Sequence, residues 1–230
     1  MLPLLLLGRY LIIGVEIKTT IASRQGEAYP LNLKDFPDSP QRLYIKGKIL
    51  ERDLLAVAIV GTRQATDLGR KRAYDFSHFL AEGGVTIVSG LARGIDTVCH
   101  QAALDAGGRT FAVLASGLDR IYPPENRTLA QKISQNGALI TEFSDGTKPL
   151  PKNFLARNRI ISGLSLAVLV VEGKKRSGTI STAGWAADQN REVFAIPGSE
   201  ATDLLISLGA RICQNPKDIL DYLGYELNNR

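Results

Sequence analysis

The sequence predicts an α/β protein with a doubly wound, mainly parallel β-sheet and helices on both of its faces. One observation behind this prediction is a series of short apolar runs, rich in Val, Ile, Leu and Phe, that starts near Leu55. The other is that longer amphipathic stretches separate these runs. Runs that are apolar on both faces suit strands that are covered on both sides. Their alternation with helices is typical of βαβ units with right-handed crossovers, so the architecture is Rossmann-like.

The elements follow one another in a regular order. The expected strands are LLAVAIVG, VTIVSG, TFAVLASG, ALITE, LAVLVVEG and EVFAIPG, with a weaker run, ARICQ, near the end. The expected helices are Thr66–Ala81, Ile95–Ala106, Glu125–Gln135, Ile160–Leu164 with its flanks, Thr179–Gln189 and Leu204–Leu208. No internal repeat or low-complexity tract interrupts this order.

Three regions are expected along the chain. Residues 1–50 form an apolar stub and a turn-rich, extended strap, residues 51–224 form the Rossmann-like domain, and residues 225–230 form a tail. The apolar opening is broken by Gly8, Arg9 and Tyr10, so it is too short to span a membrane. It also lacks the basic residues and the cleavage site of a signal peptide. A buried strand, a buried helix and an unusual start site remain open for it.

The composition of the 230 residues is that of an ordinary globular protein, with 44% hydrophobic and 22% charged residues. The net charge of +5 agrees with a polyanionic partner, although a mild basic excess is common. The two cysteines, Cys99 and Cys213, are far apart and form no CxxC pair. We therefore expect a cytoplasmic protein with no disulfide framework and no metal site, in which Cys99 packs inside a helix.

The strands end in residues that suit a binding edge. These residues are Gly61, Gly90, Gly117, Glu142, Glu172 and Gly198. In an open α/β sheet, ligands bind at the carboxyl ends of the strands, where helix N-termini offer unpaired N–H groups. Glycine also ends strands for purely local reasons, but four glycines at six strand ends favour a shared binding edge.

Two strand-to-helix connections are candidate phosphate sites. In VGTRQATDLG, Gly61 turns the chain and Thr62 and Arg63 project before a helix that is capped near Thr66 or Asp67. An arginine there can pair with a phosphate, or it can be an ordinary surface residue.

The second connection, SGLARGID, places Gly90, Arg93 and Gly94 before the next helix. It lacks the Lys-Ser/Thr ending of a Walker motif, and no GxGxxG fingerprint occurs in the chain. We therefore expect no dinucleotide and no other cofactor.

Two further stretches carry concentrated positive charge. In VVEGKKRSGTIST, a triplet that includes Lys175 precedes Ser177, Gly178 and Thr179, which can bind an anion or simply cap a helix. In GTKPLPKNFLARNRII, cations flank Phe154, which can stack on a base or anchor the loop in the core. The candidate residues in this second stretch are Lys152, Phe154, Arg157, Asn158 and Arg159. With Arg63 and Arg93, the edge would carry about six cations at loop positions.

With these residues in view, the chain resembles the DNA-processing protein A family (DprA, also called Smf). The matching stretches run in family order from Tyr29 to Leu223. They are YPLNLKDFPDSPQRLYIKG, VAIVGTR, IVSGLARGIDTVCHQAAL, SGLDRIYPPEN, LITEF, FLARNRIISGLS, VVEGKKRSGTISTAGWAADQNREVFAIPGS and LLISLGARICQNPKDIL.

The resemblance implies a Rossmann-like domain that binds single-stranded DNA, protects the incoming strand, forms homodimers and helps load the RecA recombinase in natural transformation. In the family the DNA lies in a basic pocket, whose parts correspond here to Arg63 and to Lys152 through Arg159. The chain departs from the family in a shortened loop at residues 200–203, a reduced N-terminal domain and no winged helix after Leu223.

Three functions follow from the sequence, of which a non-catalytic single-stranded DNA-binding recombination mediator leads. The alternative is a nucleotide hydrolase that uses Glu142 or Glu172 as general base on nucleoside monophosphates. It resembles the phosphoribohydrolases in layout, but the chain lacks their PGGxGTxxE-type motif. A third reading is a passive dimeric scaffold that only contacts the recombinase.

Overall fold

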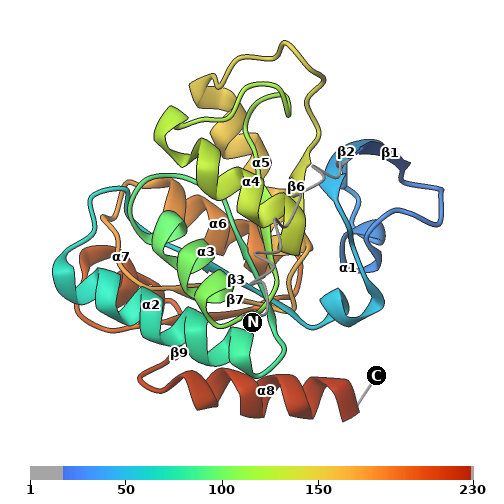
Figure 1. Ribbon diagram of the computed structural model, residues 1–230. Coiled ribbons are helices and arrows are strands. Elements are labelled where there is room, and N and C mark those ends of the chain that lie inside the picture. Colours follow the sequence, from blue (N-terminus) through green and yellow to red (C-terminus); the bar gives the residue numbers. More distant parts are fainter. Residues whose placement is uncertain (1–17, 229–230) are drawn as a thin grey trace, which may run out of the picture.

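The computed structural model describes residues 18–228, in which nine strands form one sheet with helices on both sides (Figure 1). The strand order is β1-β2-β6-β5-β4-β3-β7-β8-β9. The strands are β1 (Thr19–Ser23), β2 (Arg42–Gly47), β3 (Ala56–Val60), β4 (Thr86–Ser89), β5 (Thr110–Val113), β6 (Gly137–Thr141), β7 (Ala167–Val170), β8 (Glu192–Ala195) and β9 (Arg211–Ile212). Strands β3 to β9 are parallel to one another, whereas β1 pairs antiparallel with β2 and β2 pairs antiparallel with β6. The predicted doubly wound, mainly parallel sheet is confirmed.

The helices match most of the predicted positions. They are α1 (Leu31–Lys34), α2 (Asp67–Glu82), α3 (Ile95–Asp105), α4 (Arg127–Asn136), α5 (Pro151–Gly163), α6 (Gly178–Asp188), α7 (Glu200–Ser207) and α8 (Pro216–Asn228). Two short 3-10 helices, Glu51–Leu54 and Pro124–Asn126, precede β3 and α4. The clearest differences are that α5 begins at Pro151, well before Ile160, and that α8 had not been predicted.

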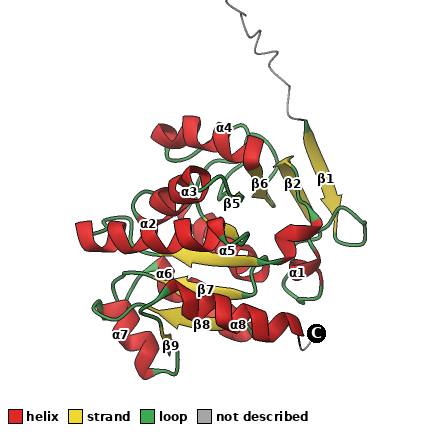
Figure 2. Ribbon diagram, turned by 60° about the horizontal axis from the view of Figure 1, so that its bottom comes forward, coloured by secondary structure: helices red, strands yellow, loops and turns green. Residues whose placement is uncertain are grey.

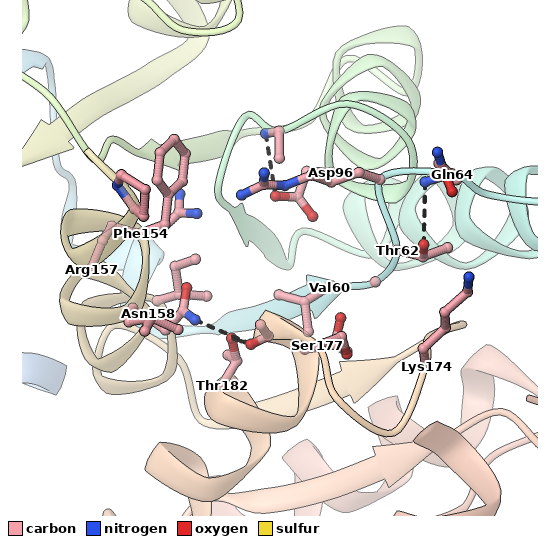
Figure 3. Close-up of a pocket in the computed structure, with 18 of the residues that line it drawn as sticks. Val60, Thr62, Gln64, Asp96, Phe154, Arg157, Asn158, Lys174, Ser177 and Thr182 are labelled. Atoms are coloured by element: carbon pink, nitrogen blue, oxygen red, sulfur yellow. Dashed lines mark hydrogen bonds between the residues drawn. The ribbon is translucent and has the colours of Figure 1, made fainter. Parts of the chain in front are cut away.

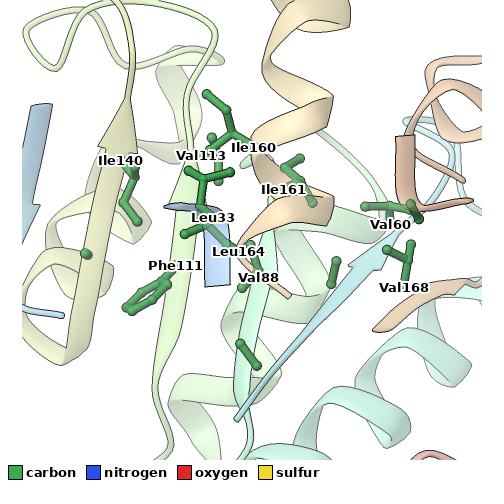
Figure 4. Packing of buried hydrophobic residues seen from close by; sticks show 14 of the residues in the cluster. Leu33, Val60, Val88, Phe111, Val113, Ile140, Ile160, Ile161, Leu164 and Val168 are labelled. Atoms are coloured by element: carbon green, nitrogen blue, oxygen red, sulfur yellow. The ribbon is translucent and has the colours of Figure 1, made fainter. Parts of the chain in front are cut away.

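Alternate residues of the strands enter two different cores. On β3, Val57 and Ile59 pack with residues of α2, α3 and α8. Ala58 and Val60 point to the other face, where they pack with residues of α5 and α6 (Figure 4). This period of two is the pleat of a strand that is buried on both faces.

The direction of winding reverses between β3 and β7. From β3 the chain adds β4, β5 and β6 on one side, and then returns to place β7, β8 and β9 on the other side (Figure 2). Such a reversal opens a crevice beyond the carboxyl ends of the two strands, because the helices that follow them leave in opposite directions. The connections after β3 and β7 therefore diverge around a common space.

Residues 18–50 are more ordered than the predicted strap. Strands β1 and β2 pair with each other and extend the sheet next to β6. Between them Tyr29 and Leu33 are buried, and the Tyr29 hydroxyl donates to the Pro40 carbonyl at 2.7 Å. The expected apolar stub, residues 1–17, lies outside the described residues. At the other end, α8 continues to Asn228, so residues 225–228 belong to a helix and not to a tail.

No helix among residues 18–228 is both long and apolar enough to cross a membrane. Cys99 lies in α3 and is fully buried, as predicted, and Cys213 is buried too.

Candidate nucleic-acid interface

An open cleft of about 740 Å³ lies where the connections after β3 and β7 diverge. We call it the switch-point cleft (Figure 3). Its wall is formed by Val60, Gly61, Thr62, Arg63, Gln64, Ala92, Asp96, Tyr122, Pro149, Pro151, Phe154, Leu155, Arg157, Asn158, Ile161, Lys174, Arg176, Ser177, Gly178, Thr179 and Thr182. It thus brings together residues that follow five strands, and nine of the predicted site residues are among them.

The connection after β3 presents an exposed arginine. The Thr62 N–H donates to the Glu172 carbonyl at 2.8 Å, which fixes the connection against the end of β7. Beyond it, the Arg63 guanidinium carbon lies 4.8 Å from the centroid of the Phe154 ring. Arg63 makes no ion pair with any residue in the described part of the chain. Its charge is held in place by an aromatic ring and remains open to the cleft.

Phe154 is neither a buried core anchor nor a free surface ring. It is half-buried in the wall of the cleft, on α5, where it also packs edge-on against Tyr122. The two ring centroids are 5.8 Å apart and the ring planes are inclined by 71°. Tyr122 follows β5 and was not predicted as a site residue. A search of the connection after each expected strand would have found it.

Arg157 is part of the floor of the cleft, which corrects the expectation that it projects from a loop. It lies on α5 and is only 4% exposed. Its Nη1 donates to the carbonyls of Gly90, at 2.7 Å, and of Val113, at the ends of β4 and β5. A Cβ on Gly90 would collide with the guanidinium, so glycine is required there by this contact.

The buried charge of Arg157 is partly balanced by the carboxyl group of Asp96. Burial, together with the nearby charge of Arg63, lowers the pKa of Arg157 to about 10, although Asp96 acts in the opposite direction. Asp96, another residue missed from the sequence, accepts from the N–H groups of Gly90 and Ala92 at 3.2 and 3.3 Å. Burial raises the pKa of its carboxyl despite the opposing effect of Arg157. Arg63 and Arg157 therefore lie near enough to repel each other.

Arg159 does not join these two arginines, contrary to expectation. Its guanidinium donates to both carboxylate oxygens of Glu142, at 2.6 and 2.7 Å, and its Nε donates to the Asp38 carbonyl at 2.8 Å. The pair is largely shielded, with side-chain exposures of 15% and 17%. The hydrogen bonds to Glu142 raise the pKa of Arg159. Since Glu142 is the partner, its carboxylate is not available as a general base.

The remaining predicted residues lie around the cleft and not in its wall. Arg93 is paired with Glu125 at 2.5 Å on the surface, so its charge is already partnered. Lys152 and Lys175 are exposed and do not line the cleft. Gly94 has a φ of +76°, and a Cβ there would collide with the Thr62 backbone, which explains the glycine structurally.

The second carboxylate at the cleft edge, Glu172, caps a helix. It accepts from the N–H and the hydroxyl of Thr66, both at 3.1 Å, while the Thr66 hydroxyl accepts from the Gly69 N–H at 3.0 Å. The predicted helix cap is therefore Thr66. Glu172 thus places its own carboxylate at the start of α2, where an anion would otherwise be favoured.

The start of α6 differs from that of α2, because its backbone donors face the cleft. Ser177, Gly178 and Thr179 all line the wall, together with Lys174 and Arg176. The Asn158 amide donates to the Gly178 carbonyl at 3.1 Å and so holds α5 and α6 together. Asn158 thus has a structural contact at the cleft, while the N–H groups of Gly178 and Thr179 make no hydrogen bond within residues 18–228.

The chain matches known proteins over most of its length. The model of a family described as DNA recombination-mediator protein A matches residues 20–224. Protein Smf of Synechocystis sp. is 44% identical over 206 residues, which are 85% of this chain and 52% of that protein. Protein Smf of Escherichia coli is also 44% identical, and the match covers 88% of this chain and 56% of that protein. The chain thus spans about half the length of these two relatives.

Solved structures show the same fold. The X-ray structure of DNA processing protein A from Streptococcus pneumoniae has a TM-score of 0.83 at 40% identity, covering 89% of this chain and 74% of that one. A structure of DNA processing protein A from Helicobacter pylori has a TM-score of 0.81 at 30% identity. It was described for the single-stranded DNA binding mode of that protein. That match covers 92% of this chain and 98% of the other.

Proposed function

Because this chain belongs to the DNA recombination-mediator protein A family, we propose that it is a recombination mediator that binds single-stranded DNA in the switch-point cleft. The observation that carries the proposal is the pair of Arg63 and Phe154. Arg63 lines the cleft without an ion-pair partner among residues 18–228, and its guanidinium carbon lies 4.8 Å from the centroid of the Phe154 ring. A cation beside an aromatic ring suits a phosphate next to an exposed base.

The walls of the cleft favour a single strand over a duplex. Tyr122 is 39% exposed and Leu155 is 55% exposed. Both line the cleft, so its wall offers apolar surface that unpaired bases can cover. Bases in a duplex are already stacked and would leave this surface uncovered. Binding without a base-specific hydrogen-bond pattern is expected to be tolerant of sequence.

We also propose that the protein is not an enzyme. The alternative, a hydrolase of nucleoside monophosphates, needs a carboxylate that is free to accept a proton from water. Glu142 is engaged with Arg159, and Glu172 is engaged with Thr66. These contacts support a binding role for the edge of the sheet.

The partners belong to the same proposal. We infer that the bound strand is protected and passed to a RecA-type recombinase, in natural transformation or in DNA recombination more generally, in the cytoplasm. The description of the family as a recombination mediator supports this inference. We further infer that the chain forms a homodimer, and the exposed side chains of Leu208, before β9, and Ile212, on β9, support it.

The proposal is tested by comparing single- and double-stranded oligonucleotides in a mobility assay, with the wild type, Phe154→Ala and Phe79→Ala. Phe79 is 41% exposed on α2, outside the cleft wall, and is the matched control. We expect a preference for the single strand that Phe154→Ala weakens, by about 1–3 kcal/mol, and that Phe79→Ala preserves. Equal shifts for all three proteins, or a preference for duplex, would overturn the proposal.

A further inference from the structure

We propose that the switch-point cleft also binds a free nucleoside 5′-monophosphate, with the phosphate at the start of α6 and the base near Tyr122 and Phe154. This inference rests on the proposed function, because it uses the same cleft. It goes further, because it assigns a phosphate subsite and a base subsite within one nucleotide-sized space.

The start of α6 offers hydrogen-bond donors that the protein does not use. Ser177 is the N-cap residue, in an extended conformation, but its side chain does not cap the helix. Within the described residues, the N–H groups of Gly178 and Thr179 make no hydrogen bond, whereas the Ile180 N–H donates to the Ser177 carbonyl. Unpaired N–H groups at the positive end of a helix dipole attract an anion.

Two hydroxyls at the same place provide independent evidence. Thr179 is only 6% exposed and lines the cleft, yet its hydroxyl makes no hydrogen bond within the described part of the chain. The Ser177 hydroxyl oxygen is buried and also lacks a partner there. Buried polar groups without partners are uncommon and costly. Of the two, the Thr179 hydroxyl is the one placed to donate to an oxygen of a phosphate in the cleft.

Two other helix starts carry side chains that occupy their donors. The start of α2 holds the carboxylate of Glu172. The start of α7 is closed by Ser199 and Thr202, which bond to each other's backbone N–H groups. At α6 no side chain of the described residues plays this part, and the space in front of the helix belongs to the cleft.

The local charge also points to an anion. Lys174 and Arg176 line the cleft on the α6 side and make no ion pair within residues 18–228. Arg63 and Arg157 face the same space, although they repel each other. Like charges gathered around one cavity are stabilised when an anion enters it.

The size and the opposite wall suit one nucleotide. A cavity of about 740 Å³ is in the range of small-ligand sites. In Figure 3, Phe154 on α5 and Ser177 at the start of α6 flank the same open space. The aromatic pair of Phe154 and Tyr122 provides apolar surface at the end where a base would lie.

Calorimetric titration of the full chain without DNA tests this proposal. The ligands are thymidine 5′-monophosphate, thymidine, deoxyribose 5-phosphate and inorganic phosphate. We expect the nucleotide to bind at least about tenfold more tightly than each of the other three, since only the nucleotide fills both subsites. If the nucleotide binds no better than inorganic phosphate, the cleft has no base subsite for a free nucleotide, and the proposal is overturned.

Variants at the phosphate subsite test whether the nucleotide binds at the start of α6. Thr179→Val removes an unpartnered hydroxyl and keeps the side-chain shape, so it should lower nucleotide affinity about tenfold without lowering stability. Thr128→Val, at an exposed site on α4 outside the cleft wall, is the matched control. If Thr179→Val impairs folding, Arg176→Ala is used instead, with the same expected loss.

A failure of nucleotide binding can be distinguished from a failure of the proposed single-strand binding. Binding of a labelled single strand is measured on the same preparations, and the nucleotide is then added as competitor. Displacement of the strand by the nucleotide supports both ideas. A strand that binds while the nucleotide does not would overturn only the inference. A nucleotide that binds while no strand does would leave the inference and remove the proposed function.

Discussion

Three arginines that look alike in the sequence have three different roles in the structure. Arg63 is exposed at the cleft, Arg157 is buried against strand-end carbonyls, and Arg159 is paired with Glu142. The partners of Arg157 and Arg159 lie 17 to 67 residues away in the chain. A sequence pattern can predict that cations gather at this edge, but the role of each cation depends on tertiary contacts.

The buried role of Arg157 leads to a prediction about stability. In Arg157→Ala the carbonyls of Gly90 and Val113 lose their donor and Asp96 loses a compensating charge. We expect the free energy of unfolding to fall by about 3–5 kcal/mol, because breaking a buried charge network leaves uncompensated groups. Urea denaturation measures this fall. Arg120→Ala, at an exposed site, is the control, and equal stability of both variants would contradict the assigned role.

His100 provides a prediction about pH. The Thr110 hydroxyl donates to the Ile87 carbonyl at 2.7 Å and therefore accepts from His100 Nδ1, which places a proton on that nitrogen. Burial lowers the pKa of His100 from 6.5 to about 3. Between these values the unfolded chain binds more protons than the folded protein, so stability falls as the pH falls through this window.

The contribution of His100 to the pH dependence of stability can be measured by comparing the wild type with a variant. A single group contributes a slope of at most about 1.4 kcal/mol per pH unit. We expect His100→Asn, which can keep the bond to Thr110, to lose part of the acid sensitivity between pH 6 and pH 4. Urea denaturation at each pH measures the slope. Parallel curves for the two proteins would show that His100 is not the group concerned.

At the level of elements, the start of α2 connects the cleft to the stability of a helix. The local cap, Thr66, could be predicted because Ser, Thr, Asp and Asn are preferred at that position. The contact with Glu172 could not, since it joins residues 106 apart in the chain. Gly69 is needed because a Cβ there would collide with the Glu172 carboxylate.

Two glycine substitutions test this connection with opposite expected signs. Gly69→Ala should displace Glu172 from the start of α2 and lower the melting temperature. Gly184→Ala, in α6 with open space around it, should raise stability by about 0.5–1 kcal/mol, because alanine favours the helix. Thermal denaturation followed by circular dichroism measures both changes. Stabilisation by both variants would contradict the account of the α2 start.

The two helices that were misjudged show where the sequence pattern is ambiguous. Helix α5 starts at Pro151, because a proline is favoured in the first turn of a helix, where it needs no N–H donor. Helix α8 contains the buried residues Ile219 and Leu223, spaced four apart as an amphipathic helix requires. That spacing was present in the sequence and could have been used.

At the level of the whole molecule, the alternation of strands and helices predicted the sheet but not the order of its strands. The cleft depends on that order, because the reversal between β3 and β7 decides which strand ends diverge. Nine of the predicted residues do line one cleft. Arg159, however, follows β6 and meets Glu142, away from the reversal, so proximity in sequence to Arg157 did not bring it into the cleft.

The two edges of the sheet lead to a prediction about assembly. Beside β9, Leu208 is 74% exposed and Ile212 is 57% exposed, and together they offer an apolar surface for a second copy. At the opposite edge, Ile21 on β1 is equally exposed, at 58%. We expect Ile212→Glu to halve the mass measured by analytical ultracentrifugation, whereas Ile21→Glu leaves it unchanged. The opposite pattern would place the homodimer contact at β1.

The central claim, that an exposed cation at the switch-point cleft holds the phosphates of a single strand, is tested most directly by the salt dependence of Arg63→Ala. Fluorescence anisotropy with a labelled single strand gives the affinity of the wild type, Arg63→Ala and Lys217→Ala at several salt concentrations. Lys217 lies on α8, outside the cleft wall. Arg63→Ala should bind more weakly, and its plot of log affinity against log salt should be shallower by about one unit, while Lys217→Ala follows the wild type. An Arg63→Ala variant with the affinity and the slope of the wild type would contradict the account.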